Sequence, residues 1–263
     1  MIRVFLAESR KLRRPTLILS TILTVLGISG LFTSLLFLLI KSQDGNGRRG
    51  QSITAQTLSL PNGGVSGFTS TATLLGIVAL CIFAAQTAQE YTFGTLRNLL
   101  VRQPSRMKLL LGKYLAMVFF ALIMNFLSLI VSVGISYLLS SRAHVSTALW
   151  SSTAGWHALA EAFGNVFLAT IGFGTFGMIL GLLLRSPISS IAIGVIWLLI
   201  VESLLSLVVK NSSRWLPGQL IGAVGNGGAL GISYQRGLIL GGGYLLAGAV
   251  VVSVLFKRRD VAN

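Results

Sequence analysis

The run Thr16–Ile40, TLILSTILTVLGISGLFTSLLFLLI, decides the fold class of this chain. It has 25 residues without a charged side chain. A helix needs about 20 apolar residues to cross the hydrocarbon of a bilayer. The run is also too long for the apolar core of a secretory signal, which has about 7 to 15 residues. We therefore interpret it as the first membrane-spanning helix.

Five further apolar runs follow, and the six predicted spans cover about 16–40, 70–88, 109–139, 158–184, 188–209 and 238–256. Charged residues make up only 10% of the 263 positions and hydrophobic residues 53%. Soluble domains carry about 25% charged residues, so lipid is predicted to be the main solvent of this chain. The sequence predicts an all-α integral membrane protein, with one transmembrane domain over 1–263 and no separate soluble domain.

The segment before the first span has the pattern of an interfacial helix. Within 1–14, Ile2, Phe5 and Leu12 share one helical face, and basic residues occupy the rest of the surface. Such a helix lies in the headgroup plane with its apolar face toward the acyl chains. Pro15 then breaks the helix and lets the chain turn into the bilayer.

The basic residues predict the orientation of the chain and its lipid partners. The formal net charge is +15, with cations concentrated at the ends of the apolar runs. Anionic lipid headgroups account for that position, so we expect membrane lipids and no nucleic acid as partners. With the N-terminus inside, the inner segments hold fourteen Lys and Arg against seven outside. This excess predicts that both termini lie in the cytoplasm.

A glycine motif in the fourth run has a structural explanation. Gly172, Gly174 and Gly177 spell GxGxxG, the fingerprint of dinucleotide binding. That fingerprint requires a preceding strand and a helix that begins at the glycines, whereas these lie in the middle of one apolar run. With Gly181 they predict a small-residue stripe for close helix packing.

The segment 210–237 mixes apolar residues such as Trp215 and Leu216 with turn residues such as Pro217. This mixture predicts short helices or a re-entrant element at the outer membrane surface.

Residues able to perform catalysis or bind metal are few. Cys81 is the only cysteine and lies in an apolar run, which predicts a small packed side chain. His144 and His157 lack the HExxH spacing. Gly112–Lys113 resembles the end of a phosphate-binding loop, but Tyr114 replaces the required Ser or Thr. We expect no enzymatic activity, cofactor or metal on this chain, so any ATP-driven step needs another polypeptide.

The polar segment between the second and third runs is the main candidate for a functional site. Glu90–Lys113 reads EYTFGTLRNLLVRQPSRMKLLLGK. Within the segment 90–104, Gly94 and Thr95 interrupt the helical pattern. Leucines then form one face of a short helix, and Pro104 ends it. From these residues alone, a lipid-skimming connector in the cytoplasm is the plainest interpretation.

The residue order of this segment resembles the cytoplasmic segment of the permease subunits of type-2 ABC exporters. The residues that carry the resemblance are Glu90, Gly94-Thr95-Leu96, Leu99-Leu100, Pro104-Ser105-Arg106 and Leu111-Gly112-Lys113. The likeness extends to the N-terminal helix, the six spans and the outer element. In that family the segment is a coupling helix that seats in a groove of a separate ATPase. The resemblance therefore implies a set of ATPase-coupling residues: Glu90, Gly94, Thr95, Leu96, Arg97, Leu99, Leu100 and Arg102.

The resemblance also implies the assembly. It implies a permease subunit that works with two copies of a cytosolic ABC ATPase, on which ATP and Mg bind, and with a second copy of itself or a close homologue. Because the chain has no fused nucleotide-binding domain, it is similar to the short bacterial half-permeases of the inner membrane. The expected activity is export of a hydrophobic or amphipathic drug, peptide or lipid by alternating access.

Glu202 is the remaining candidate for chemistry, because it lies inside the fifth run. A carboxylate in the membrane needs a partner or water. Glu202 either lines a substrate path, or it reaches the outer interface or pairs with Lys210 or Arg214. An ion-coupled secondary transporter or channel that uses Glu202 is the alternative function.

Overall fold

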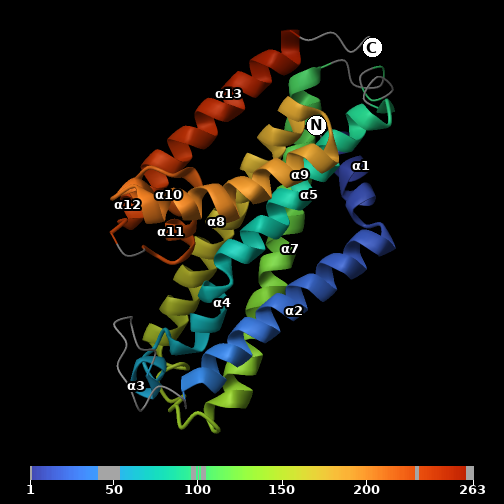
Figure 1. Ribbon diagram of the computed structural model, residues 1–263. Helices are drawn as coiled ribbons and strands as arrows, with labels where there is room; N and C mark the ends of the chain where they lie inside the picture. The colour runs from blue at the N-terminus through green and yellow to red at the C-terminus, as the bar shows by residue number, and fades with distance from the viewer. Residues whose placement is uncertain are drawn as a thin grey trace.

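The computed structural model describes residues 2–40, 54–95, 99, 101, 105–228 and 231–258. Within these ranges the chain folds into helices and turns without a β-strand (Figure 1). Six helices are long and apolar enough to cross a membrane: Pro15–Leu39, Gly63–Thr92, Arg106–Ser140, Thr153–Leu184, Pro187–Val208 and Tyr234–Lys257. This result confirms the all-α class, and it fits a multi-pass membrane protein.

The elements follow one another as a series of long helices with short helices between them. The helices before the fourth span are α1 (Ile2–Leu12), α2 (Pro15–Leu39), α3 (Ala55–Leu58), η2 (Gly63–Val65), α4 (Ser66–Ser70), α5 (Ala72–Thr92) and α7 (Arg106–Ser140). The remaining helices are α8 (Thr153–Leu184), α9 (Pro187–Ile196), η3 (Trp197–Val201), α10 (Glu202–Val208), η4 (Ser212–Arg214), α11 (Pro217–Gly225), α12 (Tyr234–Arg236), η5 (Gly237–Gly241) and α13 (Gly242–Arg258).

The helix boundaries have local causes. Pro15 occupies the first turn of α2, where its missing N–H is not needed. Arg185 ends α8 in the left-handed conformation with φ 54°. The Ser186 hydroxyl then accepts a hydrogen bond from the Ser189 N–H at the start of α9. Because only this short turn separates them, α8 and α9 pack as neighbours, as predicted.

The spans are longer than predicted at several ends. The second span begins at Gly63 with η2 and α4. Glycines and polar residues there give no apolar run, so hydropathy did not predict this part of the helix. The fourth begins at Thr153, because the Ser152 hydroxyl caps it by accepting from the Gly155 N–H. At 35 residues, α7 is about 52 Å long, so it tilts or projects beyond a hydrocarbon core of roughly 30 Å.

The centre of the molecule is the interface between α5 and α8. The ring of Phe83 in α5 lies over Gly174 of α8, and Phe173 of α8 lies over Gly76 of α5. A methyl group added at Gly177 would lie 2.3 Å from the carbonyl oxygen of Leu80. The glycine stripe therefore lets two backbones approach closely, which confirms the packing interpretation of the GxGxxG motif.

The helices α2 and α7 pack through hydroxyl side chains. Ser29 and Ser128 share a hydrogen bond of 2.6 Å, and both side chains are fully buried. Thr33 and Ser132 continue the two rows one turn further along, and they are also fully buried. Small polar residues at this spacing allow close contact between helices in an apolar solvent.

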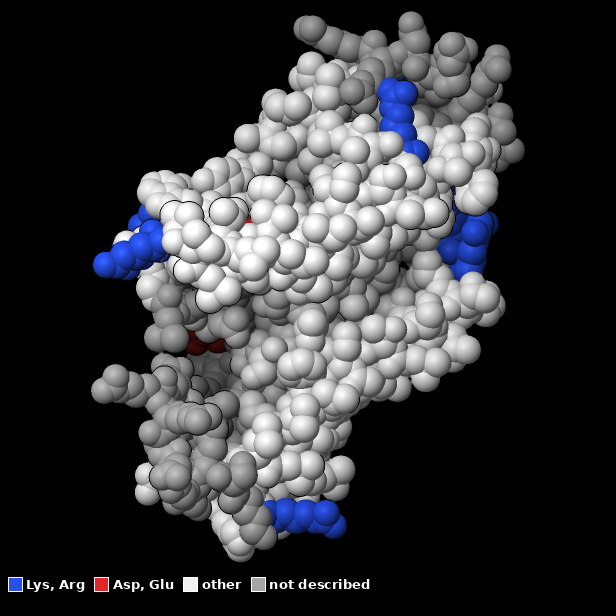
Figure 2. Space-filling view, viewed as in Figure 1, with Lys and Arg blue, Asp and Glu red and all other residues white. Residues whose placement is uncertain are grey.

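The segment between the fifth and sixth spans forms short helices, as predicted. The longest of them, α11, is buried over nearly its full length and packs against α8, α5 and η5. On the face drawn in Figure 2, the Lys and Arg side chains lie toward the margins, with a wide uncharged area between them. That distribution fits helices with lipid-facing sides.

Candidate functional site

A cluster of four charged side chains joins α1, α5 and α7. The Lys113 ammonium in α7 lies 3.0 Å from Glu8 Oε2 in α1 and 2.8 Å from Glu90 Oε1 in α5. Lys11 Nζ lies 2.9 Å from the same Glu90 oxygen and also pairs with Glu8. Two carboxylates and two ammonium groups therefore neutralise one another between three helices.

Three of the four side chains are buried and Lys11 is 32% exposed, so the cluster is open to solvent only on the Lys11 side. Glu8 and Lys11 lie one turn apart on the same face of α1, so both reach the same point. The side chains of Glu8 and Lys113 are 5% and 3% exposed. Lys113 also donates a hydrogen bond of 3.0 Å to the Gln86 carbonyl oxygen in α5. Buried charges persist only when they are paired and hydrogen-bonded, and this ammonium meets both conditions.

Protonation equilibria of the α1 residues follow from this arrangement. Burial on its own would raise the pKa of Glu8, but the charges of Lys113 and Lys11 and their hydrogen bonds outweigh it. The pKa of Glu8 is therefore lower than its ordinary value. Burial would lower the pKa of Lys11, but Glu90 and Glu8 outweigh that effect and raise it. Both groups are held in their charged forms.

Two further cations connect helix ends in the same region. The Arg185 guanidinium, just after α8, lies 5.3 Å from the ring centre of Tyr91 in α5. Arg106, the first residue of α7, donates a hydrogen bond of 2.8 Å to the Phe256 carbonyl oxygen near the end of α13. The ends of five helices are thus joined by polar contacts on either side of the segment 93–105.

The predicted coupling residues fall into two groups. Leu96, Arg97, Leu100 and Arg102 lie outside the described residues. Glu90, Gly94, Thr95 and Leu99 are described, and they differ in exposure.

Of the described four, Glu90 is buried in the ion cluster, so its carboxylate binds within the chain and is not an exposed docking group. Leu99 is partly buried against the hydrophobic core. Gly94 turns the chain after α5 with φ 63°, and Thr95 is exposed. Among the described residues of the segment 93–105, Phe93 and Val101 are the strongly exposed apolar side chains, at 71% and 80%.

Glu202 holds the N-terminus of α11. Its Oε1 accepts hydrogen bonds from the Gly218 N–H at 2.8 Å and the Trp197 Nε1–H at 2.9 Å. Its Oε2 accepts from the Gln219 N–H at 2.9 Å. A carboxylate at a helix N-terminus satisfies free backbone donors and interacts favourably with the helix dipole.

Neither Lys210 nor Arg214 forms an ion pair with Glu202 in the described part of the chain, which corrects that expectation. The Glu202 side chain is 1% exposed and does not line the apolar cavity between α7, α8 and α13.

Sequence reasoning missed the partners of both acidic groups. Glu8 was passed over, although it is an acid in an otherwise basic segment and one of only six acidic residues in the chain. That rarity was the available signal, because a lone acid among the cations of an amphipathic helix is expected to pair with a nearby base. No pattern pointed to Gly218 and Gln219, because their backbone N–H groups carry no sequence signature.

Comparison with known proteins identifies a family, and the description of that family names no activity. No curated protein matches the chain. A model of a family described as "Protein of unknown function (DUF2705)" matches residues 52–262, which includes five of the six apolar helices and both Glu90 and Glu202. Since this match covers most of the 263 residues, the chain belongs to the DUF2705 family.

Proposed function

We propose that this chain is the membrane-spanning permease subunit of an ATP-driven ABC exporter. Two copies, or one copy and a close homologue, span the bacterial cell membrane with both termini in the cytoplasm. Two separate ATPase subunits supply the energy. Their closure moves the segment 90–104, and the transmembrane helices then carry a hydrophobic or amphipathic substrate outward by alternating access.

The ion cluster is the observation that carries this proposal. The segment 93–105 is anchored on one side by Glu90 and on the other by Lys113, which lie 2.8 Å apart. A push on the segment therefore displaces α5 and α7 together rather than bending one of them. Because α5 interlocks with α8 through the Phe83–Gly174 contact, the displacement passes into the centre of the molecule.

The exposed apolar side chains of the segment supply the docking surface. Phe93 and Val101 are 71% and 80% exposed, whereas Leu99 packs toward the core. Exposed apolar residues beside basic ones are typical of surfaces that bind another protein. In the proposal, Phe93 and Val101 enter the groove of the ATPase, and Leu99 keeps the segment on the membrane domain.

Affinity purification from the native membrane tests the proposal. The tagged chain is expected to retain an ATPase that contains nucleotide-binding motifs, and the complex is expected to hydrolyse ATP faster with substrate. Val101→Asp would bury an unpaired carboxylate in the groove and should release the ATPase. Leu60→Asp is the matched control, since Leu60 is 49% exposed and lies in the turn after α3, away from this segment.

Two results would count against the proposal. Retention of the ATPase by Val101→Asp would mean that the segment is only a connector. Proton-driven flux by the purified chain alone in liposomes would support the ion-coupled alternative.

A further inference from the structure

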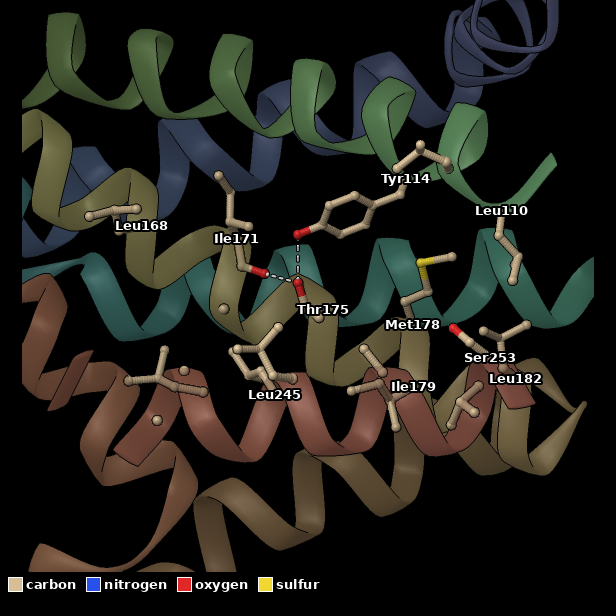
Figure 3. Close-up of a pocket in the computed structure, with 18 of the residues that line it drawn as sticks. Leu110, Tyr114, Leu168, Ile171, Thr175, Met178, Ile179, Leu182, Leu245 and Ser253 are labelled. Carbon is tan, nitrogen blue, oxygen red and sulfur yellow. Dashed lines mark hydrogen bonds between the residues drawn. The ribbon is translucent and has the colours of Figure 1, made fainter. Parts of the chain in front are cut away.

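A groove lies between α7, α8 and α13, with a cavity volume of about 650 Å³ (Figure 3). Leu168, Thr175 and Leu182 mark the wall formed by α8, and Leu245 and Ser253 mark the wall formed by α13. Almost all of its lining is apolar. The volume falls within the roughly 300–1,000 Å³ of ordinary ligand sites.

The two ends of the groove differ in chemistry. Ile221 and Val224 of α11 line one end, which is wholly apolar. Met107 and Lys108 of α7 line the other end, which lies beside the ion cluster. Lys108 is exposed, and no described carboxylate lies within ion-pair distance of its ammonium. A ligand with one anionic end and an apolar body would match this asymmetry.

The length of the groove suits a whole acyl chain. Leu168 and Leu182 are fourteen residues apart on α8, which corresponds to about 21 Å of helix. One leaflet contributes about half of a hydrocarbon core that is roughly 30 Å thick. An acyl chain that enters beside Lys108 would therefore contact apolar residues along its whole length.

The two polar side chains in the middle of the groove, Tyr114 and Thr175, bind each other. The hydroxyl oxygens of Tyr114 in α7 and Thr175 in α8 lie 2.9 Å apart, and a dashed line marks this hydrogen bond between the two helices in Figure 3. Because the Thr175 hydroxyl donates to the Ile171 carbonyl oxygen at 2.8 Å, it accepts the hydrogen bond of the Tyr114 hydroxyl. The pair offers no free donor to a polar ligand, so the middle of the groove favours a hydrocarbon chain.

A glycine keeps the groove open. Gly242, the first residue of α13, lines the groove, and a methyl group added there would meet no atom within 4 Å. Its neighbour Gly243 has the same free space but does not line the groove. The two positions therefore separate the effect of filling the groove from the effect of a larger residue in this turn of the helix.

We propose that this groove binds one acyl chain of an anionic phospholipid, with the phosphate beside Lys108. The lipid comes from the leaflet at the α1 end of the molecule. The acyl chain fills the groove between α13 on one side and α7 and α8 on the other. This inference does not depend on the proposed export function, because a lipid of the surrounding membrane is present whether or not the chain transports.

Photo-crosslinking tests the site. The purified full chain is placed in neutral phosphatidylcholine nanodiscs that contain a trace of phosphatidylglycerol with a photoreactive group on one acyl chain. Labelled peptides are expected from α8 and α13. Gly242→Leu should reduce labelling about tenfold, because the leucine side chain would occupy space that the acyl chain needs. Gly243→Leu should leave it unchanged.

The headgroup is tested with a second pair of variants. Lys108→Gln should reduce labelling by the anionic probe about fivefold, the factor that corresponds to about 1 kcal/mol per cation near an anionic surface. It should not change labelling by a phosphatidylcholine probe with the same acyl chain. Lys257→Gln is the control, since Lys257 is exposed near the end of α13 but does not line the groove.

Three outcomes would overturn the proposal. Equal labelling of Gly242→Leu and the unmodified chain would show that the lipid lies elsewhere. Equal labelling by the anionic and neutral probes would remove Lys108 as the phosphate partner. An unlabelled groove would mean that another protein segment, such as a second copy of the chain, occupies it.

Discussion

Lys113 in α7 lies 3.0 Å from Glu8 in α1, although the two residues are far apart in the sequence. This pair holds the N-terminal helix against the third span. The same ammonium also binds Glu90 of α5, so one buried cation determines how three helices meet. Its removal leaves two carboxylates with only Lys11 to balance them.

Lys113→Met should therefore lower the free energy of unfolding by about 3–5 kcal/mol, the usual cost of leaving a buried charge without its partner. Chemical unfolding in detergent measures this effect. Lys108→Met is the matched control, because Lys108 lies five residues earlier in α7, is exposed and forms no ion pair with a described residue. Similar stability of the two variants would mean that the cluster does not hold α1 in place.

The stability of the chain should depend on pH through the two α1 residues. The pKa of Glu8 is lowered in the fold, so its contribution is complete above the ordinary value of 4.5 and is lost as pH falls through the lowered value. The pKa of Lys11 is raised, so its contribution is complete below 10.5 and is lost as pH rises through the raised value.

The midpoint temperature of unfolding should therefore fall at both extremes of pH. Glu8→Gln cannot titrate, so it should remove part of the acid-side decrease and leave part of the basic-side decrease. An unchanged acid-side profile for this variant would show that other carboxyl groups control acid unfolding.

Gly177→Ala should separate α5 from α8. The added methyl carbon would lie 2.3 Å from the Leu80 carbonyl oxygen, and a backbone atom cannot move aside cheaply. We expect a loss of about 1–3 kcal/mol in stability. Gly164→Ala in the same helix has nothing within 4 Å of the new carbon and should be neutral or slightly stabilising. Equal effects at both positions would contradict the packing role of the glycine stripe.

Glu202→Ala should destabilise the chain by about 2–3 kcal/mol, because three donors lose a charged acceptor. Glu202→Gln should cost less, since its amide oxygen still accepts hydrogen bonds. Unfolding and transport measured on the same samples separate a structural role from a path-lining one. The exposed Glu161 provides the control, and Glu161→Ala should change stability by less than about 0.5 kcal/mol. If Glu202→Ala is as stable as the unmodified chain but fails to transport, the result would support a role for Glu202 in the substrate path.

Cysteine labelling tests the proposed orientation. In a Cys81→Ala background, a cysteine at Val101 should resist an impermeant thiol reagent in intact cells, and one at Leu60 should react. Both side chains are exposed, at 80% and 49%, so access depends on the side of the membrane. The reverse pattern would place the segment 93–105 outside and would remove its coupling role.

The sequence by itself determined that the fold is all-α and that most of the chain is suited to lipid rather than to water. Runs such as Thr16–Ile40 can satisfy their backbone hydrogen bonds in lipid only as helices, so hydropathy predicted six spans with most ends within a few residues. It failed at Gly63, where the helix begins with small and polar residues that no apolar pattern marks. The packing role of Gly177 was also readable, because a glycine stripe in a membrane helix has few other uses.

Only the tertiary structure decided what the charged side chains do. The family resemblance implied a coupling role for Glu90, and the structure shows its carboxylate buried against Lys113 and Lys11. Glu202 was predicted to face substrate or a distant cation, yet it accepts hydrogen bonds from the backbone of α11. The partners in both sites come from different helices. Their proximity is a consequence of how the helices cross, and spacing along one chain does not encode it.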